Sequence, residues 1–253
     1  SNAQAEMKSA WETTLTHKVN SSEFSEDAEL LVTSNEKMIS LVETKTGTVK
    51  WTKDFKTMTD GKLKKVDERI PMWDAKCIFL FDRKGGKDQM AVIDLENGNM
   101  LWSTDKYEDV TESSIAYIAE LGMFAVANKK AFSMIKARTG EEVWETQGFK
   151  GALAKYIYND NTIVALNYSP AAAGEGLLGG FGKMAAGFGA FKSQITKLNT
   201  KTGEVIWQTD IKGAVEKEIA TGKILAKMKL QGNKILLTMQ GLQCYDMNNG
   251  SLI

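Results

Sequence analysis

The sequence Glu43-Thr44-Lys45-Thr46-Gly47-Thr48-Val49-Lys50-Trp51 sets a pattern to which the chain returns four more times. The later copies are Asp94 to Trp102 (DLENGNMLW), Lys136 to Trp144 (KARTGEEVW), Asn199 to Trp207 (NTKTGEVIW) and Asp246 to Ile253 (DMNNGSLI). The last copy stops one residue before the place of its Trp. Copies spaced by about 40 to 50 residues, with one longer interval, are typical of an array of small structural units.

A glycine and a tryptophan mark each copy. The glycines are Gly47, Gly98, Gly140, Gly203 and Gly250, and each follows Thr or Asn. The residues five and eight positions before each glycine are apolar, which is typical of a strand. Because glycine adopts positive φ without steric cost, a Thr-Gly or Asn-Gly pair between two apolar runs predicts a tight hairpin. Each unit is therefore predicted to be strand, turn, strand, with the Trp early in the second strand.

The repeated tryptophans are predicted to be structural. They are Trp51, Trp102, Trp144 and Trp207, and Trp11 begins a segment that resembles the same strand of a unit whose first part is absent. An indole at the same place in every hairpin packs against the neighbouring unit and buries roughly 150–250 Å². We therefore favour core packing over ligand stacking for these side chains.

Each unit shows about four short β-rich segments. They include residues 29–33 and 38–42 in the first unit, 78–80 and 90–95 in the second, 123–127 in the third, 155–158, 162–167 and 194–198 in the fourth, and 224–230, 234–239 and 242–246 in the fifth. Four antiparallel strands repeated at this period indicate an all-β protein, a β-propeller of four-stranded blades with five blades visible. A β-sandwich would not need a Gly–Trp hairpin in every unit.

Composition narrows the range of partners. The 253 residues include 32 Lys and Arg and 32 Asp and Glu, so no global field favours nucleic acid. No apolar run approaches the ~18–20 residues of a transmembrane span. Cys77 and Cys244 lie at different positions of their units and there is a single His, so we expect neither a disulfide framework nor a metal site. Residues 1–3 look like a cloning remnant, and residues 4–253 are predicted to form one propeller domain with an insertion at 169–192.

The hairpins resemble those of the pyrroloquinoline-quinone (PQQ)-like propeller repeats, which have a small residue, then Asp, Thr-Gly and Trp. Ala91 to Trp102 matches this motif most fully, whereas the Asp column is replaced by Glu43, Lys136 and Asn199 in other units. The resemblance implies a propeller that lies outside the cytoplasm, periplasmic or secreted. It leaves function open, because the family includes quinoprotein dehydrogenases, outer-membrane assembly lipoproteins and sensor domains.

The family's propellers usually close when an N-terminal strand completes the last blade, and the segment at Trp11 is a candidate for that strand. However, Gly250 to Ile253 begins the same strand and overlaps Met7 to Ala10. The resemblance therefore leaves two alternatives, a five-bladed closure with a small overlap or part of a propeller of six to eight blades, and it favours the larger one.

The motifs for catalysis that the resemblance would imply are not found in the sequence. Quinoproteins of the family use an adjacent Cys-Cys pair and a calcium ligand set, and no such pair or calcium loop is present. His17 has no catalytic motif around it, and Gly179 to Gly182 lacks the Lys-Ser/Thr of a phosphate-binding loop. We therefore expect no catalytic residues and no cofactor. A PQQ-dependent oxidoreductase and a small-ligand sensor domain are the alternatives.

The insertion, Ser169 to Lys192, replaces a short hairpin between the second and third strands of the fourth unit. Its large apolar residues follow helical spacing and are Leu177, Phe181, Met184, Phe188 and Phe191. Because glycines weaken an isolated helix, the segment would order only by burying this face. Four readings are open: it covers its own propeller, docks on a partner protein or apolar surface, is disordered, or forms a lid over a ligand. The sequence thus predicts a non-catalytic scaffold whose insertion contacts a protein partner or cell-envelope component.

Overall fold

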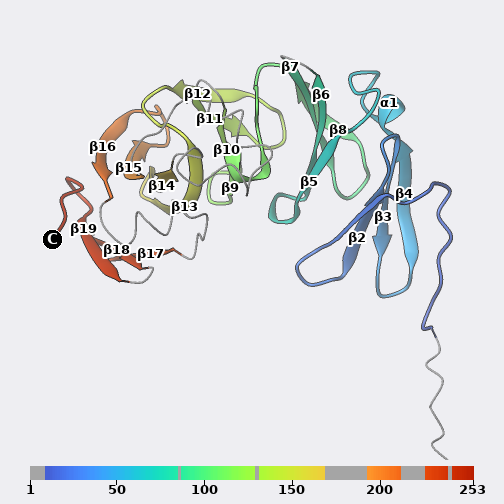
Figure 1. Cartoon of the computed structure of the whole chain (residues 1–253), viewed down its shortest axis with the longest axis horizontal. Helices are drawn as coiled ribbons and strands as arrows, with labels where there is room; N and C mark the ends of the chain where they lie inside the picture. Colours follow the sequence, from blue (N-terminus) through green and yellow to red (C-terminus); the bar gives the residue numbers. More distant parts are fainter. Residues whose placement is uncertain (1–8, 85–86, 129–130, 169–192, 212–225, 239–240) are drawn as a thin grey trace, which may run out of the picture. The chain divides into compact units, whose positions relative to one another are not determined.

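The computed structural model describes residues 9–84, 87–128, 131–168, 193–211, 226–238 and 241–253. Nearly all regular structure in these residues is antiparallel β-sheet (Figure 1). The chain divides into two compact units, Ser1–Asp105 and Lys106–Ile253. Each unit is described separately below.

Unit 1 contains two four-stranded sheets with orders β1-β2-β3-β4 and β5-β6-β7-β8. Its elements are β1 (Ser21–Phe24), β2 (Leu30–Ser34), β3 (Met38–Glu43), β4 (Thr48–Asp54), α1 (Phe55–Met58), β5 (Glu68–Met72), the 3-10 helix η1 (Trp73–Ala75), β6 (Cys77–Lys84), β7 (Lys87–Asp94) and β8 (Met100–Thr104). In each sheet, strands adjacent in the sequence pair with each other, which is the up-and-down order of a propeller blade.

Unit 2 contains two four-stranded sheets, β9 to β12 and β13 to β16, and a three-stranded sheet, β17 to β19. Its elements are the 3-10 helix η2 (Glu112–Ser114), β9 (Ile115–Ile118), β10 (Met123–Ala127), β11 (Phe132–Lys136), β12 (Glu142–Thr146), β13 (Ala152–Asn159), β14 (Thr162–Tyr168), β15 (Gln194–Asn199), β16 (Val205–Asp210), β17 (Lys227–Gln231), β18 (Lys234–Thr238) and β19 (Leu242–Asp246). In the last sheet, Leu252 forms a single bridge to Tyr245, at the place where a fourth strand would begin.

The predicted β-propeller fold is confirmed: the described residues form five antiparallel sheets, one for each copy of the repeat. The elements that the sequence did not predict include β1, α1 and the two 3-10 helices. β1 is polar and mostly exposed, so it carries no apolar alternation, and it is a strand because it pairs with β2 from Ser21↔Ser34 to Phe24↔Leu31. The short helix α1 begins at a local cap, where the Asp54 side chain accepts a hydrogen bond from the backbone N–H of Thr57 at 2.8 Å.

The repeated turns share one geometry. The five glycines of the motif have φ between 71° and 76°. The N–H of each bonds to the carbonyl four residues earlier, as Gly98 does to Asp94, so the loop is longer than a two-residue hairpin. Where this earlier residue is Asp94, Asn199 or Asp246, its side chain also accepts the N–H two residues further on. The turn shape shared by the five copies therefore depends on backbone hydrogen bonds, and a short polar side chain stabilises it further in three of them.

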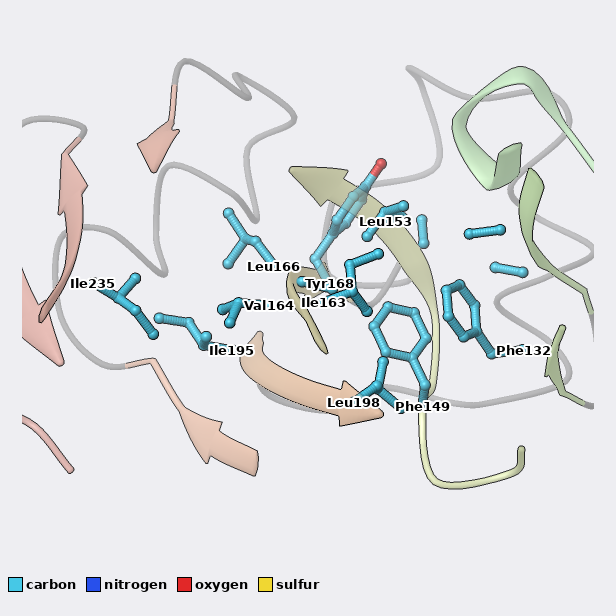
Figure 2. Packing of buried hydrophobic residues seen from close by; sticks show 14 of the residues in the cluster. Phe132, Phe149, Leu153, Ile163, Val164, Leu166, Tyr168, Ile195, Leu198 and Ile235 are labelled. Carbon is cyan, nitrogen blue, oxygen red and sulfur yellow. The ribbon is translucent and has the colours of Figure 1, made fainter. Parts of the chain in front are cut away.

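Each unit has its own apolar core. In unit 1, side chains from both sheets and from α1 form one cluster, in which Leu41, Phe55, Ile78 and Leu80 are fully buried. In unit 2, a larger cluster joins all three sheets, and Figure 2 shows Phe132 and Phe149 facing each other within it. Their ring centroids lie 4.1 Å apart. Burial of each large apolar side chain contributes about 1.5–3 kcal/mol, so the sheets of a unit are held together mainly by these shared clusters.

Candidate functional site

Three tryptophans of the repeat lie against the turn of the following sheet in the same unit, and they are Trp51, Trp144 and Trp207. In unit 1, Trp51 Nε1 donates to the Leu95 carbonyl at 2.9 Å. A Cβ built on Gly98 would lie 2.9 Å from the Trp51 ring. Since no side chain larger than hydrogen fits beneath this indole, the Gly and Trp columns of the repeat form one contact.

Unit 2 repeats this contact twice. Trp144 Nε1 donates to the Thr200 carbonyl at 2.8 Å, and a Cβ on Gly203 would lie 2.5 Å from the Trp144 ring. Trp207 Nε1 donates to the Met247 carbonyl at 2.9 Å and covers Gly250 in the same way. Each of these indoles therefore covers a glycine of the next blade and donates its N–H to a carbonyl of that blade.

Trp102 and Gly140 are a further tryptophan and a further glycine of the repeat. Trp102 is 7% exposed and meets Phe79 edge to face, with ring centroids 6.1 Å apart. Gly140 has the positive φ of the other turns, 75°.

Trp11 makes the same contact on the first sheet, although no strand is assigned to it. A Cβ on Gly47 would lie 2.6 Å from Trp11 Cδ2, and Thr13 Oγ1 donates to the Gly47 carbonyl. In unit 2, Thr209 Oγ1 donates to the Gly250 carbonyl at 2.6 Å beside Trp207. The segment from Trp11 to Thr13 therefore contacts blade one as the Trp strand of a preceding blade would.

The five apolar residues predicted to bind a partner lie outside the described residues. They are Leu177, Phe181, Met184, Phe188 and Phe191.

His17 has a partner that its sequence context did not indicate. Its Nε2 lies 2.8 Å from Ser40 Oγ, which in turn lies 2.7 Å from Thr52 Oγ1. A His–Ser pair is the start of a nucleophilic site, but Ser40 is fully buried and cannot reach a substrate. The pair therefore fastens residues 9–20 to the first blade. No sequence pattern predicts this contact, because the two residues come together only in the folded chain.

A cleft between the two blades of unit 1 is the clearest candidate site in the described part of the chain. Its volume is about 610 Å³, within the range of small-ligand sites. Its floor is apolar: Leu41 and Leu95 are buried, and Leu30 and Trp73 are half-buried at the edge of the unit 1 core. The sequence did not predict this site because its lining comes from five separate parts of the chain.

The rim of the cleft is predominantly acidic. The β1–β2 hairpin contributes Glu26, Asp27 and Glu29, and the second blade contributes Asp74 and Glu96. Two lysines, Lys50 and Lys76, also line it. The rim therefore carries five carboxylates and two ammonium groups, and its net charge is negative.

One rim carboxylate is fixed by its own hairpin. Asp27 Oδ1 accepts hydrogen bonds from Ser25 Oγ at 2.6 Å and from the Glu29 N–H at 3.0 Å. These bonds, that from Ser25 first, lower the pKa of Asp27 below its ordinary value. This carboxylate is therefore held ionised and in one place at the mouth of the cleft.

Two further searches concern the described residues only. Among them, no group of three or more His, Cys, Asp or Glu side chains is arranged to hold a metal ion. None of the helices in this part of the chain is long and apolar enough to cross a membrane.

Comparison with known proteins gives a family match and several structural similarities. A family model described as the outer membrane protein assembly factor BamB, of PQQ-like repeats, matches residues 39–253. A chain of the mitotic checkpoint complex is similar with a TM-score of 0.51 and 13% identity, over 96% of this chain and 65% of that one. No curated protein sequence matches the chain.

Two bacterial structures are similar at lower scores. The quinohemoprotein alcohol dehydrogenase ADHIIG from Pseudomonas putida HK5 has a TM-score of 0.45 and 15% identity, over 88% of this chain and 40% of that one. BamB from Moraxella catarrhalis has a TM-score of 0.40 and 11% identity, over 96% of this chain and 78% of that one. The chain thus spans less than two thirds of the dehydrogenase and of the checkpoint-complex chain.

Proposed function

The chain belongs to the PQQ-like propeller family described as the outer membrane protein assembly factor BamB, and on that premise we propose that it is a non-catalytic scaffold that binds a protein partner in the cell envelope. The family match over residues 39–253 is the observation that carries this proposal. The proposed location is outside the cytoplasm, periplasmic or secreted.

The packing contacts of the repeated indoles support the proposal of a non-catalytic scaffold. Aromatic side chains are the usual platforms for flat ligands, but Trp51, Trp144 and Trp207 each cover a glycine and donate their N–H to a turn carbonyl. Partner binding must then use loops, which is where binding residues gather on rigid β scaffolds. The two candidates are the insertion at 169–192 and the cleft of unit 1.

The insertion is tested by replacement. One variant carries a short Asn-Gly hairpin in place of residues 169–192, and a second keeps the segment but changes Phe181 and Phe188 to Ser. We expect both variants to melt at the temperature of the wild type and to lose the same protein, identified by mass spectrometry, from an envelope extract. A lower melting temperature with unchanged retained proteins would show that the segment covers its own propeller.

The oxidoreductase alternative has a separate test. The chain is titrated with PQQ and Ca²⁺ and followed by absorbance, and an alcohol with an electron-accepting dye is then added. We expect no saturable spectral change and no dye reduction, because the sequence has no adjacent cysteines. Stoichiometric quinone binding with dye reduction would refute the scaffold proposal.

A further inference from the structure

The unit 1 cleft combines a half-buried indole with carboxylates for which the described part of the chain supplies no ion-pair partner. Among the described residues, no ion pair joins Glu26, Glu29, Asp74 or Glu96 to either lysine of the rim. In contrast, Arg83 in the same unit is bound by both Glu68 and Asp88. The cleft therefore retains an uncompensated negative potential, which favours a cationic ligand.

The apolar floor of the cleft favours one class of cation, a guanidinium on a long side chain. Trp73 lies in η1, packs against the unit 1 core and lines the cleft with part of its surface. An indole face attracts cations, and it binds guanidinium better than ammonium because the planar guanidinium also stacks. Leu30 and Leu41 extend this apolar floor and suit the methylene stem of a long side chain.

The rim suits the same group. A guanidinium offers five N–H donors in a planar fork, which matches carboxylates on either side of it. The first blade presents Asp27 and Glu29, and Asp74 and Glu96 lie on the second blade. Asp27 is held in place by its hydrogen bonds within the hairpin, so part of the rim is already ordered before binding.

We propose that this cleft binds an arginine side chain of an extended segment of the protein partner, stacked on Trp73 and paired with the rim carboxylates. The volume of about 610 Å³ exceeds that of one side chain and leaves room for neighbouring residues of the segment. The proposal rests on the proposed scaffold function, since it gives the chemistry of one contact with the partner.

The test uses the full chain and a blocked Gly-Arg-Gly peptide, with Gly-Lys-Gly and the neutral Gly-citrulline-Gly as comparison probes. Binding is followed at low ionic strength by NMR of the tryptophan side-chain N–H signals. We expect saturable binding of the arginine peptide centred on the Trp73 signal, weaker binding of the lysine peptide and none of the citrulline peptide. Added salt should weaken it, because the rim is exposed.

Matched variants separate the cleft from the general charge of the protein. Trp73→Leu keeps an apolar floor and should raise the dissociation constant of the arginine peptide about threefold to tenfold. Glu26→Gln with Glu29→Gln should raise this dissociation constant about threefold or more. Glu120→Gln with Glu204→Gln makes the same change in net charge at exposed positions of unit 2 and should leave it unchanged. Asp27 is left in place because it orders the hairpin.

Three results would overturn the proposal. They are no saturable binding of the arginine peptide, equal binding of the citrulline peptide, and equal weakening by the two glutamate pairs. Failure of the scaffold function is separate: a protein that binds the arginine peptide at the cleft but retains no envelope protein keeps the cleft assignment and loses the scaffold. A protein that retains an envelope protein but does not bind the arginine peptide supports the scaffold function and refutes the cleft assignment.

Discussion

The junction between the two blades of unit 1 and the junctions of unit 2 are built from the same motif but leave different amounts of space. The indole N–H bonds are nearly equal, 2.9 Å for Trp51 and 2.8 Å for Trp144. Yet Trp51 is half-buried, whereas Trp144 is 7% exposed and lies closer to its glycine.

The surroundings account for the difference. In unit 2, a Cβ on Gly148 would lie 2.7 Å from Val205, and Gln208 Nε2 donates to the Gly148 carbonyl at 3.1 Å, so the next loop also packs against the blade. In unit 1, Leu95 and Glu96, from the turn that receives Trp51, line the open cleft. The Gly–Trp contact thus ties neighbouring blades together at the turn, and the loops decide whether the remaining space becomes core or a site.

The largest effect is expected at a tight junction of unit 2. Gly203→Ala forces an L residue into positive φ and places a methyl group 2.5 Å from the Trp144 ring. We expect a loss of about 2–5 kcal/mol in the free energy of unfolding, from the left-handed backbone and the overpacking together. Gly232→Ala has the backbone penalty alone, about 1–2 kcal/mol, since nothing lies within 4 Å of its Cβ. Urea unfolding measures both, and equal losses would contradict a tight junction.

The corresponding change in unit 1 should cost less. In Gly98→Ala the methyl group would lie 2.9 Å from the Trp51 ring, which is half-buried and has the cleft beside it. We expect a loss of about 2–3 kcal/mol, against about 1–2 kcal/mol for Gly61→Ala, which has positive φ and open space. The comparison of junctions fails if Gly98→Ala destabilises the protein as much as Gly203→Ala.

Alkaline pH should weaken unit 2, because all six tyrosines lie in it. Burial raises the pKa of Tyr107 and of Tyr168 from 10.0 to about 12. The folded state therefore holds these phenol protons while the unfolded chain releases them, and stability falls as pH rises from about 10 to about 12.

A tyrosine variant tests this effect. Tyr168→Phe should remove on the order of 2 kcal/mol of the loss of unfolding free energy over this pH range, as measured by urea unfolding. At neutral pH the variant also loses the hydrogen bond of the hydroxyl, so the slope with pH is the informative quantity. A slope identical to that of the wild type would show that Tyr168 titrates normally in the fold.

The fold could be predicted because its determinants are local and repeated. The Gly turn and the Trp four residues later are readable in four copies, and short apolar runs mark most strands, such as Met38–Glu43. β1 escaped prediction because pairing with β2, and not an apolar pattern, makes it a strand. The cap at Asp54 is also local, but one turn of helix is too short for periodicity to reveal.

The site was less predictable for a physical reason. The cleft joins residues from the β1–β2 hairpin, β3, β4, η1 and the turn before β8, and no sequence spacing indicates that Trp73 and Asp27 line one cavity. The same holds for His17 and Ser40. The acidic hairpin and the extra Trp outside the repeat can both be seen in the sequence. Only the geometry of the blades shows that they lie together.

The smallest expected effect also distinguishes the two junctions, at the ends of the strands that carry Trp51 and Trp144. β4 ends at Asp54, whose carboxylate accepts the Thr57 N–H at 2.8 Å, and β12 ends at Thr146, whose neutral hydroxyl accepts the Gly148 N–H at 3.2 Å. Asp54→Ala should cost about 1 kcal/mol at neutral pH, the usual loss at a helix N-cap, and Thr146→Ala should cost no more.

Only the unit 1 cap should depend on pH. The bonds from Thr57 lower the pKa of Asp54 below 3.8, so its contribution is present above that value and is lost as pH falls through the folded pKa. The difference between wild type and Asp54→Ala in urea unfolding should therefore shrink in acid, while that of Thr146→Ala stays constant. If both differences shrink together, acid weakens the junctions through other carboxylates, and the charged cap does not set unit 1 apart from unit 2.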